Sequence, residues 1–292
     1  MGSGKRLRAA LVALGYRSLG HEKLEPILSP AAAIELLHNF FLIHDDIIDR
    51  SEERRHQPTV HRLVESDYEA RLEKFGLADR RHFAYSVALL AGDLCCALAY
   101  EALAKSDFPP ERVLSGIQLM HEMADATVIG QTLDVTQALT ADISAPEIFK
   151  IHLLKTAKYS FEGPLYLGLT LGGAEPDALA GFREYAANVG IAFQIQDDIL
   201  GMFGSESELG KPVASDLEEG KQTLLVFFAR THGTASERER LKALLGKRGI
   251  TPPELAEAQT IIRETGALNY SITCASQLIG IAKYSLRDLP LS

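Results

Sequence analysis

The sequence is poor in cysteine and lacks long uninterrupted apolar runs. Its 292 residues include three cysteines, two of them adjacent (Cys95 and Cys96), which are too few for the disulfide framework of a small secreted protein. No apolar run reaches the roughly 18 residues that a membrane helix needs, and the first residues contain no apolar signal region. We therefore expect a soluble, cytoplasmic protein with no stable membrane insertion.

Positive charge is also scarce. The chain has 30 Lys and Arg against 39 Asp and Glu, a net charge of −9. Because nucleic-acid affinity comes largely from Lys and Arg that neutralise phosphates, nucleic acid is not an expected partner. The hydrophobic fraction of 46% and the charged fraction of 24% are those of a globular chain, and they exclude disorder and collagen-like structure.

Signals for long helices are abundant. Ser29 followed by Pro30 is typical of a helix start, and it opens an apolar-periodic stretch that runs to Asp49. Alternating runs with hairpin turns, which would predict strands, are not found. Three Ser or Thr residues stand three positions before a Glu, as in a capping box: Ser144 and Glu147, Ser236 and Glu239, Thr251 and Glu254. These patterns predict one all-α domain that covers residues 1–292.

Two apolar helices end in clustered carboxylates. Asp45 and Asp49 are four residues apart, so they share one helical face about 6 Å apart along the axis, with Asp46 beside them. Asp197 and Asp198 end a second apolar stretch. Carboxylate oxygens are hard ligands that favour Mg²⁺. For the first cluster alone, a solvated helix end with incidental acids is an equal alternative, and the second cluster favours a metal site.

Basic residues stand next to these acidic clusters in a chain that is negative overall. Such a pattern favours a bound polyanion bridged by metal, and diphosphate fits best because Arg can fork its oxygens while Lys adds a point charge. The alternative is a set of unrelated surface ion pairs. The basic residues concerned are Lys5, Arg6, Arg8, Arg54, Arg55, Lys155, Lys211 and Lys221.

These residues together resemble the trans-isoprenyl diphosphate synthases, or polyprenyl synthetases, over nearly the whole chain. The matching motifs occur in the family's order: 4–8, 44–49 followed by 54–55, 92–93, 130–134, 155–156, 193–198 and 210–223. The resemblance implies an isoprenoid-synthase bundle of long helices around a deep central cavity, usually a homodimer. It also implies a prenyltransferase that joins an allylic diphosphate to isopentenyl diphosphate.

The resemblance implies a role for each matching residue. Asp45 and Asp49 would hold two Mg²⁺ ions with Asp46 in support, and Asp197 would hold a third. Thr156 and Gln194 would stabilise positive charge at the allylic carbon. The departing diphosphate would be neutralised by Arg54, Lys155, Lys211 and Lys221. The diphosphate of isopentenyl diphosphate would be gripped by Lys5, Arg8, His38 and Arg55. The remaining candidates are assigned to packing: His44, Cys95, Cys96 and Cys274.

Two aromatic residues precede the first acidic cluster. Phe40 and Phe41 stand five and four residues before Asp45, and helical side chains lean toward the N-terminus. In the family, aromatics at these places limit chain growth, which predicts a short product, farnesyl diphosphate (C15). Two alternatives remain: ordinary core phenylalanines, or a shifted helix that opens the pocket to geranylgeranyl length (C20).

The chain departs from the family pattern in two places. Gly201 stands where many relatives carry the last aspartate of the second motif; since only Asp197 is expected to bind metal directly, we expect activity to survive. The motif Gly4-Lys5 normally follows a further helix, so we expect that N-terminal helix to be missing here. A noncatalytic regulatory subunit of a heteromeric synthase and a terpene cyclase are the competing functions, and the retained aspartates and basic residues argue against both.

Overall fold

A computed structural model describes residues 4–137, 143–205 and 213–287, with the side chains of 176–181 left aside. The described chain is helical except for one short hairpin, so the expected all-α isoprenoid-synthase fold class is confirmed. The elements are α1 (Leu7–Arg17), η1 (Glu25–Ile27), α2 (Leu28–Ile48), β1 (Glu53–Arg54), β2 (Gln57–Pro58), α3 (Val60–Asp67), α4 (Glu69–Leu72), α5 (Leu77–Ala104), α6 (Pro110–Gln137), α7 (Ala145–Ile151), η2 (His152–Glu162), α8 (Gly163–Gly172), α9 (Pro176–Phe203), α11 (Ser215–Glu218), α12 (Leu224–His232), α13 (Ala235–Leu244), α14 (Pro252–Glu264) and α15 (Ala267–Ser285).

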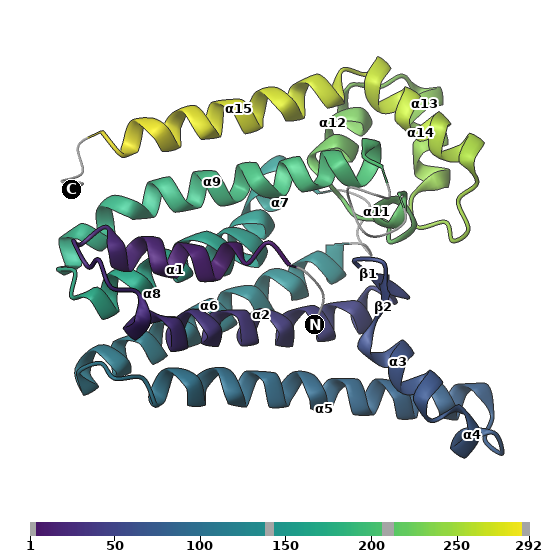
Figure 1. Cartoon of the computed structure of the whole chain (residues 1–292). Coiled ribbons are helices and arrows are strands. Elements are labelled where there is room, and N and C mark those ends of the chain that lie inside the picture. Colours follow the sequence, from purple (N-terminus) through teal and green to yellow (C-terminus); the bar gives the residue numbers. More distant parts are fainter. Residues whose placement is uncertain (1–3, 138–142, 206–212, 288–292) are drawn as a thin grey trace.

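The long helices lie side by side (Figure 1). Among the described residues they enclose two large hydrophobic cores and one small cluster of Leu165, Tyr166 and Leu169. The first core joins α1, α2, α5, α6 and α8 through residues such as Val12, Leu37 and Met120. The second joins α9 to α12–α15 through Ile195, Leu224 and other buried residues. The pairs α2 and α5, α1 and α8, and α9 and α15 are in extensive contact. The carboxylate-bearing ends of α2 and α9 belong to different cores and face the space between them.

The segment η2 is a π-helix clamped between α6 and α9. Such helices are rare and occur mostly at functional sites, and this one carries Lys155 and Thr156. A Cβ atom at Gly130 on α6 would lie 2.5 Å from the Lys155 backbone nitrogen, and one at Gly190 on α9 would overlap the Cα of Ala157. Both neighbours are backbone or near-backbone atoms that cannot swing away. The two glycines therefore let α6 and α9 fix the backbone of η2 closely.

The hairpin β1–β2 has two successive non-glycine residues with positive φ. Arg55 (φ 55°) and His56 (φ 58°) form its turn between the paired residues Arg54 and Gln57. Hairpin turns of this hand usually take Asn or Gly at these positions, because side chains disfavour the left-handed region. The turn therefore retains a conformational cost, and it presents Arg54 and Arg55 to the cavity described below.

The helix starts only partly follow the sequence signals. Capping boxes are present at Ser144 and at Thr251, as expected. The box expected at Ser236 is wrong: Thr234 caps α13 and pairs with Glu237, two residues earlier. α2 begins at Leu28 directly after η1, so Ser29 is not its cap. Instead the Ser29 hydroxyl donates to the carbonyl of Ala102 on α5, 2.8 Å away.

The sequence has no uninterrupted apolar run of membrane-spanning length, but two of its helical segments are long and apolar on average. Segments Glu25–Ile48 and Leu77–Ala104 have the length and composition of membrane-spanning helices, with 39% and 22% of their most apolar windows buried. This resemblance is weak evidence, because core helices of soluble proteins share it. Within α2, Ile34 and Leu37 are almost fully buried. The absence of membrane insertion stays a prediction.

Replacing Gly130 by Ala tests the clamp on η2. The added methyl group must push the η2 backbone away, so we expect the free energy of unfolding to fall by about 1 to 3 kcal/mol. Gly280 on α15 is the matched control, because a Cβ there meets nothing within 4 Å; Gly280→Ala should leave stability unchanged or raise it by up to about 1 kcal/mol. Urea unfolding measures both. Equal behaviour of the two variants would contradict the clamp.

Candidate active site

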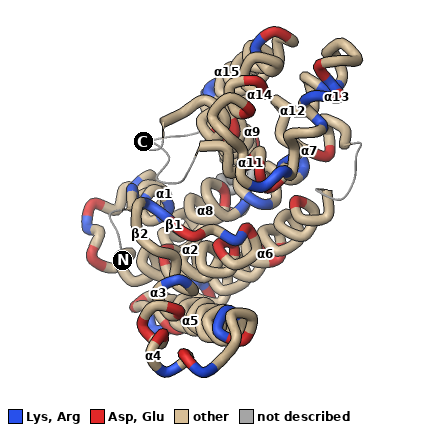
Figure 2. The backbone as a smooth tube through the Cα atoms, turned by 90° about the vertical axis from the view of Figure 1, so that its right-hand side faces the viewer, with Lys and Arg blue, Asp and Glu red and all other residues tan. Residues whose placement is uncertain are grey.

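A cavity of about 630 Å³ lies between the two cores and is lined by residues of both acidic motifs. Asp45 and Asp49 reach it from α2, and Asp197 reaches it from α9. In the end-on view of Figure 2, basic and acidic positions lie close together beside α2, α6 and α11. The other expected site residues that line the cavity are Lys5, Arg8, His38, Phe40, Phe41, Arg54, Arg55, Lys155, Thr156, Gln194 and Lys221. Lys211 lies outside the described residues.

Cations stand between the carboxylates of this cavity. Lys155 Nζ is 3.8 Å from Asp45 Oδ1, and Lys221 Nζ is 3.9 Å from Asp49 Oδ2. Each lysine has further acidic partners: Lys155 is 2.5 Å from Asp134, and Lys221 is 3.1 Å from Asp216 and 2.8 Å from Glu219. Burial lowers the pKa of both lysines, but the neighbouring carboxylates more than offset this, so both pKa values are raised. Both lysines therefore remain positively charged.

Asp46 takes a different position from its two neighbours. It is 4% exposed, does not line the cavity, and accepts hydrogen bonds from the Arg54 guanidinium at 2.6–2.7 Å. Burial raises its pKa, an effect that the Arg54 hydrogen bond partly opposes. The contact holds Arg54 at 3.4 Å from Asp45. A direct role of Asp46 in metal binding stays a prediction.

The carboxylates of this cavity are suited to a bound divalent cation. Burial raises the pKa of Asp49 to about 7, and the neighbouring Asp45 carboxylate adds to this effect. A divalent cation would relieve this unfavourable accumulation of negative charge. In the described ranges no three carboxylate, His or Cys side chains converge into a ready metal centre. Mg²⁺ suits this arrangement, because it is usually bound by one or two carboxylates together with waters and substrate phosphates.

A second cationic group lies at the N-terminal side of the cavity. Arg8 Nη1 is 3.1 Å from His38 Nε2, and Arg8 Nη2 donates to Tyr159 Oη at 2.8 Å and to Ser160 Oγ at 2.6 Å. Burial lowers the pKa of His38 to about 2, with Arg8 the next cause. The ring is therefore neutral near pH 7, and its Nε2 accepts a hydrogen bond from the Arg8 guanidinium. Lys5 and Arg55 line the same part of the site.

The apolar part of the cavity contains the two expected aromatic residues. The rings of Phe40 and Phe41 lie 4.9 Å apart between centroids. Phe40 packs edge-on against His44 at 4.6 Å, and Phe41 packs against Tyr159 at 5.1 Å. Both phenylalanines therefore border the open cavity and are held by neighbouring rings.

The space beside Gly201 is occupied by a carboxylate from α11. A Cβ atom at this position would overlap Oδ2 of Asp216, which is 7% exposed and paired with Lys221. The place where the last side chain of the second motif would begin thus already holds an acidic group. An aspartate at 201 would have to displace it.

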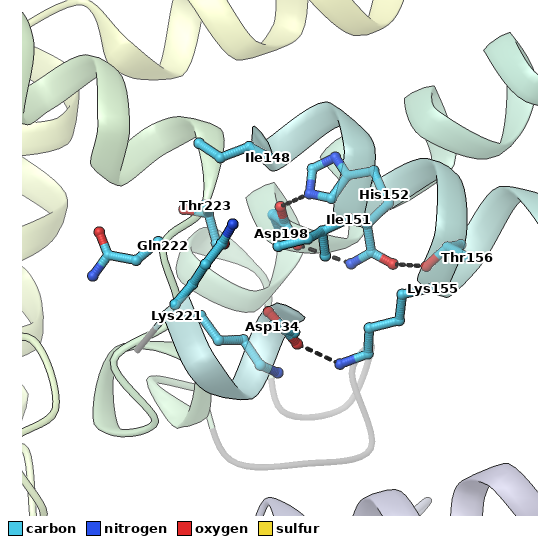
Figure 3. A pocket seen from close by; sticks show the side chains of 12 residues that line it. Asp134, Ile148, Ile151, His152, Lys155, Thr156, Asp198, Lys221, Gln222 and Thr223 are labelled. Carbon is cyan, nitrogen blue, oxygen red and sulfur yellow. Dashed lines mark hydrogen bonds and ion pairs between the residues drawn. The ribbon is translucent and has the colours of Figure 1, made fainter. Parts of the chain in front are cut away.

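Several polar residues that the sequence reasoning did not single out complete the site. Asp134 contacts Lys155, and Tyr159 and Ser160 hold Arg8. Tyr159 lies four residues after Lys155, so helical spacing could have indicated it. His152 and Asp198 are both buried and face each other at 3.2 Å in a small pocket that also contains Thr156 and Gln194 (Figure 3). For His152 the sequence offered no signal.

Comparison with known proteins agrees with this geometry. The family model described as polyprenyl synthetase matches residues 1–262. A geranylgeranyl diphosphate synthase of Saccharolobus solfataricus is 34% identical over 99% of this chain and 81% of its own length. A (2E,6E)-farnesyl diphosphate synthase of Mycobacterium bovis is 33% identical over 92% of this chain and 69% of its own length.

A solved structure agrees over nearly the whole chain. It is a geranylgeranyl pyrophosphate synthase from Corynebacterium glutamicum, in complex with isoprenyl diphosphate and magnesium. It superposes with a TM-score of 0.93 and 34% identity, covering 99% of this chain and 82% of its own. The matches of family model, sequence and fold lead to one conclusion: the chain belongs to the polyprenyl synthetase family and is a prenyltransferase.

Proposed function

We propose that this short-chain prenyl diphosphate synthase joins isopentenyl diphosphate to an allylic diphosphate and releases farnesyl diphosphate as its main product. The observation that carries the proposal is the single cavity lined by Asp45, Asp49 and Asp197 together with Lys155 and Lys221. These groups suit a diphosphate leaving group bridged to carboxylates by cations.

The first step is the ionisation of the allylic substrate. Breaking its C–O bond leaves an allylic carbocation and a diphosphate anion, so groups fixed near the diphosphate lower the barrier as charge develops. Lys155, Lys221 and Arg54 are in place for this, because their positions are already held by Asp134, Asp216 and Asp46. Three Mg²⁺ ions, two at Asp45 and Asp49 and one at Asp197, would supply further positive charge on the diphosphate oxygens.

The second substrate binds at the opposite cationic group. Arg8, Lys5, Arg55 and the neutral ring of His38 can hold the diphosphate of isopentenyl diphosphate. Its double bond then attacks C1 of the allylic cation and forms the new C–C bond. The adduct loses a proton to the departed diphosphate, and the apolar lining keeps water from the cation.

The length of the product depends on the space beside Phe40 and Phe41. A prenyl tail that extends from the carboxylates along α2 meets these rings within about one helical turn. Relatives of similar identity include enzymes named for both C20 and C15 products. We propose C15 because both rings border the cavity and are packed against His44 and Tyr159. Geranylgeranyl diphosphate is the alternative product.

Two other functions are less well supported. A noncatalytic subunit of a heteromeric synthase would not need both sets of carboxylates, yet Asp45 and Asp197 line the same cavity. A terpene cyclase would need one diphosphate site only, and the group around Arg8 provides a second.

Replacing both phenylalanines by Ala should lengthen the product. The purified wild-type chain, given Mg²⁺, isopentenyl diphosphate and geranyl diphosphate, should form mainly farnesyl diphosphate. Phe40→Ala/Phe41→Ala should form geranylgeranyl or longer products, because the rings no longer stop the tail. Product chromatography measures both. An identical product pattern would show that the phenylalanines do not limit growth, and an inactive wild-type chain with both substrates would favour the regulatory subunit.

We also propose that two copies of the chain associate through α5. This helix exposes a row of leucines: Leu89, Leu90, Leu94 and Leu98, of which Leu90 and Leu94 are 66% and 60% exposed. A contiguous apolar patch of this kind marks an interaction surface. A second copy suits it, because an uncharged row can pair with its own image across a two-fold axis.

Charged substitutions on α5 should separate the two copies. Leu90→Glu/Leu94→Glu places four like charges in the proposed interface, so we expect a monomer, whereas the wild type sediments as a dimer in analytical ultracentrifugation. Tyr284→Glu, on α15 at the opposite side of the bundle (Figure 1), is the control and should remain dimeric. A monomeric wild type, or a dimeric leucine variant, would contradict the proposed interface.

A further inference from the structure

Four side chains form a continuous row from the main cavity into the small pocket beside it (Figure 3). Thr156 Oγ1 donates to Gln194 Oε1 at 2.6 Å. Gln194 Nε2 donates to Asp198 Oδ1 at 2.9 Å. The other oxygen of Asp198 lies 3.2 Å from His152 Nε2. The row thus joins the first residue of η2 to α9 and returns to η2 at Thr156.

Asp198 decides which way the Gln194 amide points. An amide side chain can present either its oxygen or its NH₂ group to a neighbour, and the two orientations have the same shape. A carboxylate only accepts hydrogen bonds, so the NH₂ group must face Asp198. The reverse orientation would set two oxygens against each other at 2.9 Å. Gln194 Oε1 is therefore directed toward Thr156 and the main cavity, which both residues also line.

His152 packs against Asp198, the residue that sets this orientation. Both side chains are 7% exposed. A buried carboxylate oxygen without a hydrogen-bond donor is costly. Among the described residues Asp198 Oδ2 accepts no hydrogen bond, and the His152 ring lies against it at 3.2 Å. The ring favours the carboxylate when its Nε2 carries a proton, because that proton would then face Asp198. The histidine lines the small pocket and not the main cavity, so its effect on Gln194 would pass through Asp198.

We propose that His152 and Asp198 are positioning residues that keep the Gln194 carbonyl oxygen directed at the allylic carbocation. The inference rests on the proposed function, in which Thr156 and Gln194 stand beside the ionising carbon. An amide oxygen carries partial negative charge and stabilises a cation, whereas the reversed NH₂ group would repel it. A group fixed before the reaction needs no reorganisation when charge develops. The orientation therefore contributes in the transition state more than in substrate binding.

Three variants separate orientation from packing. Asp198→Asn removes the acceptor-only partner, so either amide orientation of Gln194 becomes possible. His152→Leu removes the polar ring beside Asp198, whereas His152→Gln places an NH donor at a similar reach. His121→Leu is the control, because His121 is an exposed residue of α6 that contacts Tyr100 and does not line either pocket. If Asp198→Asn does not fold, the comparison of His152→Leu with His152→Gln still tests the proposal.

Two readouts are needed. Steady-state kinetics with geranyl and isopentenyl diphosphate give kcat and the KM for the allylic substrate. Side-chain amide NMR of ¹⁵N-glutamine-labelled protein gives the exchange of the Gln194 NH₂ protons with water, with the signals assigned by their loss in Gln194→Ala. The second readout requires no turnover, so it is independent of the proposed activity.

We expect kcat to fall on the order of 10- to 100-fold in Asp198→Asn and His152→Leu, with KM for the allylic substrate nearly unchanged. In both variants the Gln194 amide protons should exchange faster. His152→Gln should restore most of kcat and of the protection, and His121→Leu should match the wild type. The inference is overturned by equal kcat in His152→Leu and wild type, by equal losses in His152→Gln and His152→Leu, or by unchanged amide exchange.

The test also distinguishes this inference from the proposed function. Suppose that the wild-type chain shows no prenyl transfer, but the exchange rate of its Gln194 NH₂ protons changes in the His152 and Asp198 variants. This result would contradict the proposed function and support the proposed orientation of Gln194. An active wild-type chain whose kcat and amide exchange are insensitive to both residues would contradict the inference alone.

Discussion

One constraint governs the rest of the structure: two helices bring several carboxylates into one cavity, where their like charges repel one another. α2 contributes Asp45 and Asp49, and α9 contributes Asp197. Like charges gathered in one cavity are tolerated only where cations compensate them. The protein supplies Lys155, Lys221 and Arg54 and fixes each of them with a further acid, at Asp134, Asp216 and Asp46. This balance leaves a site that can accept metal ions together with a diphosphate.

The π-helical segment η2 is closely packed by its neighbours and also carries residues of the candidate site. The close approach of α6 at Gly130 and of α9 at Gly190 fixes the backbone that carries Lys155 and Thr156. Tyr159 and Ser160 from the same segment hold Arg8 from α1. One short segment thus connects the two cationic groups of the cavity. A shift of its backbone would move Lys155 and Arg8, and with them the two proposed diphosphate sites.

Capping and apolar patterns predicted the helical class, and helical spacing placed Asp45 and Asp49 on one face. The resemblance to the polyprenyl synthetases implied the central cavity and most of its other lining residues. The sequence could not predict contacts that tertiary packing alone creates. His152 has no motif around it, and its role depends on the position of α9. Asp46 lies in the first acidic motif but pairs with Arg54, since its helical face points away from the cavity. The start of α13 was misplaced by two residues because Ser236 and Thr234 offer equivalent local caps. Gly201 suggested a missing acid, whereas Asp216 already fills that space.

The most direct test of the account is a double-mutant cycle between the two carboxylate-bearing helices, with Asp45→Asn and Asp197→Asn. The rate of prenyl transfer from geranyl diphosphate is measured at saturating Mg²⁺ for the wild type, both single variants and the double variant. If the two aspartates act on one metal-bridged diphosphate, each single variant loses on the order of 100-fold, and the double variant loses far less than the product of the two. Losses that simply multiply, or a full rate in Asp197→Asn, would contradict a shared diphosphate between α2 and α9.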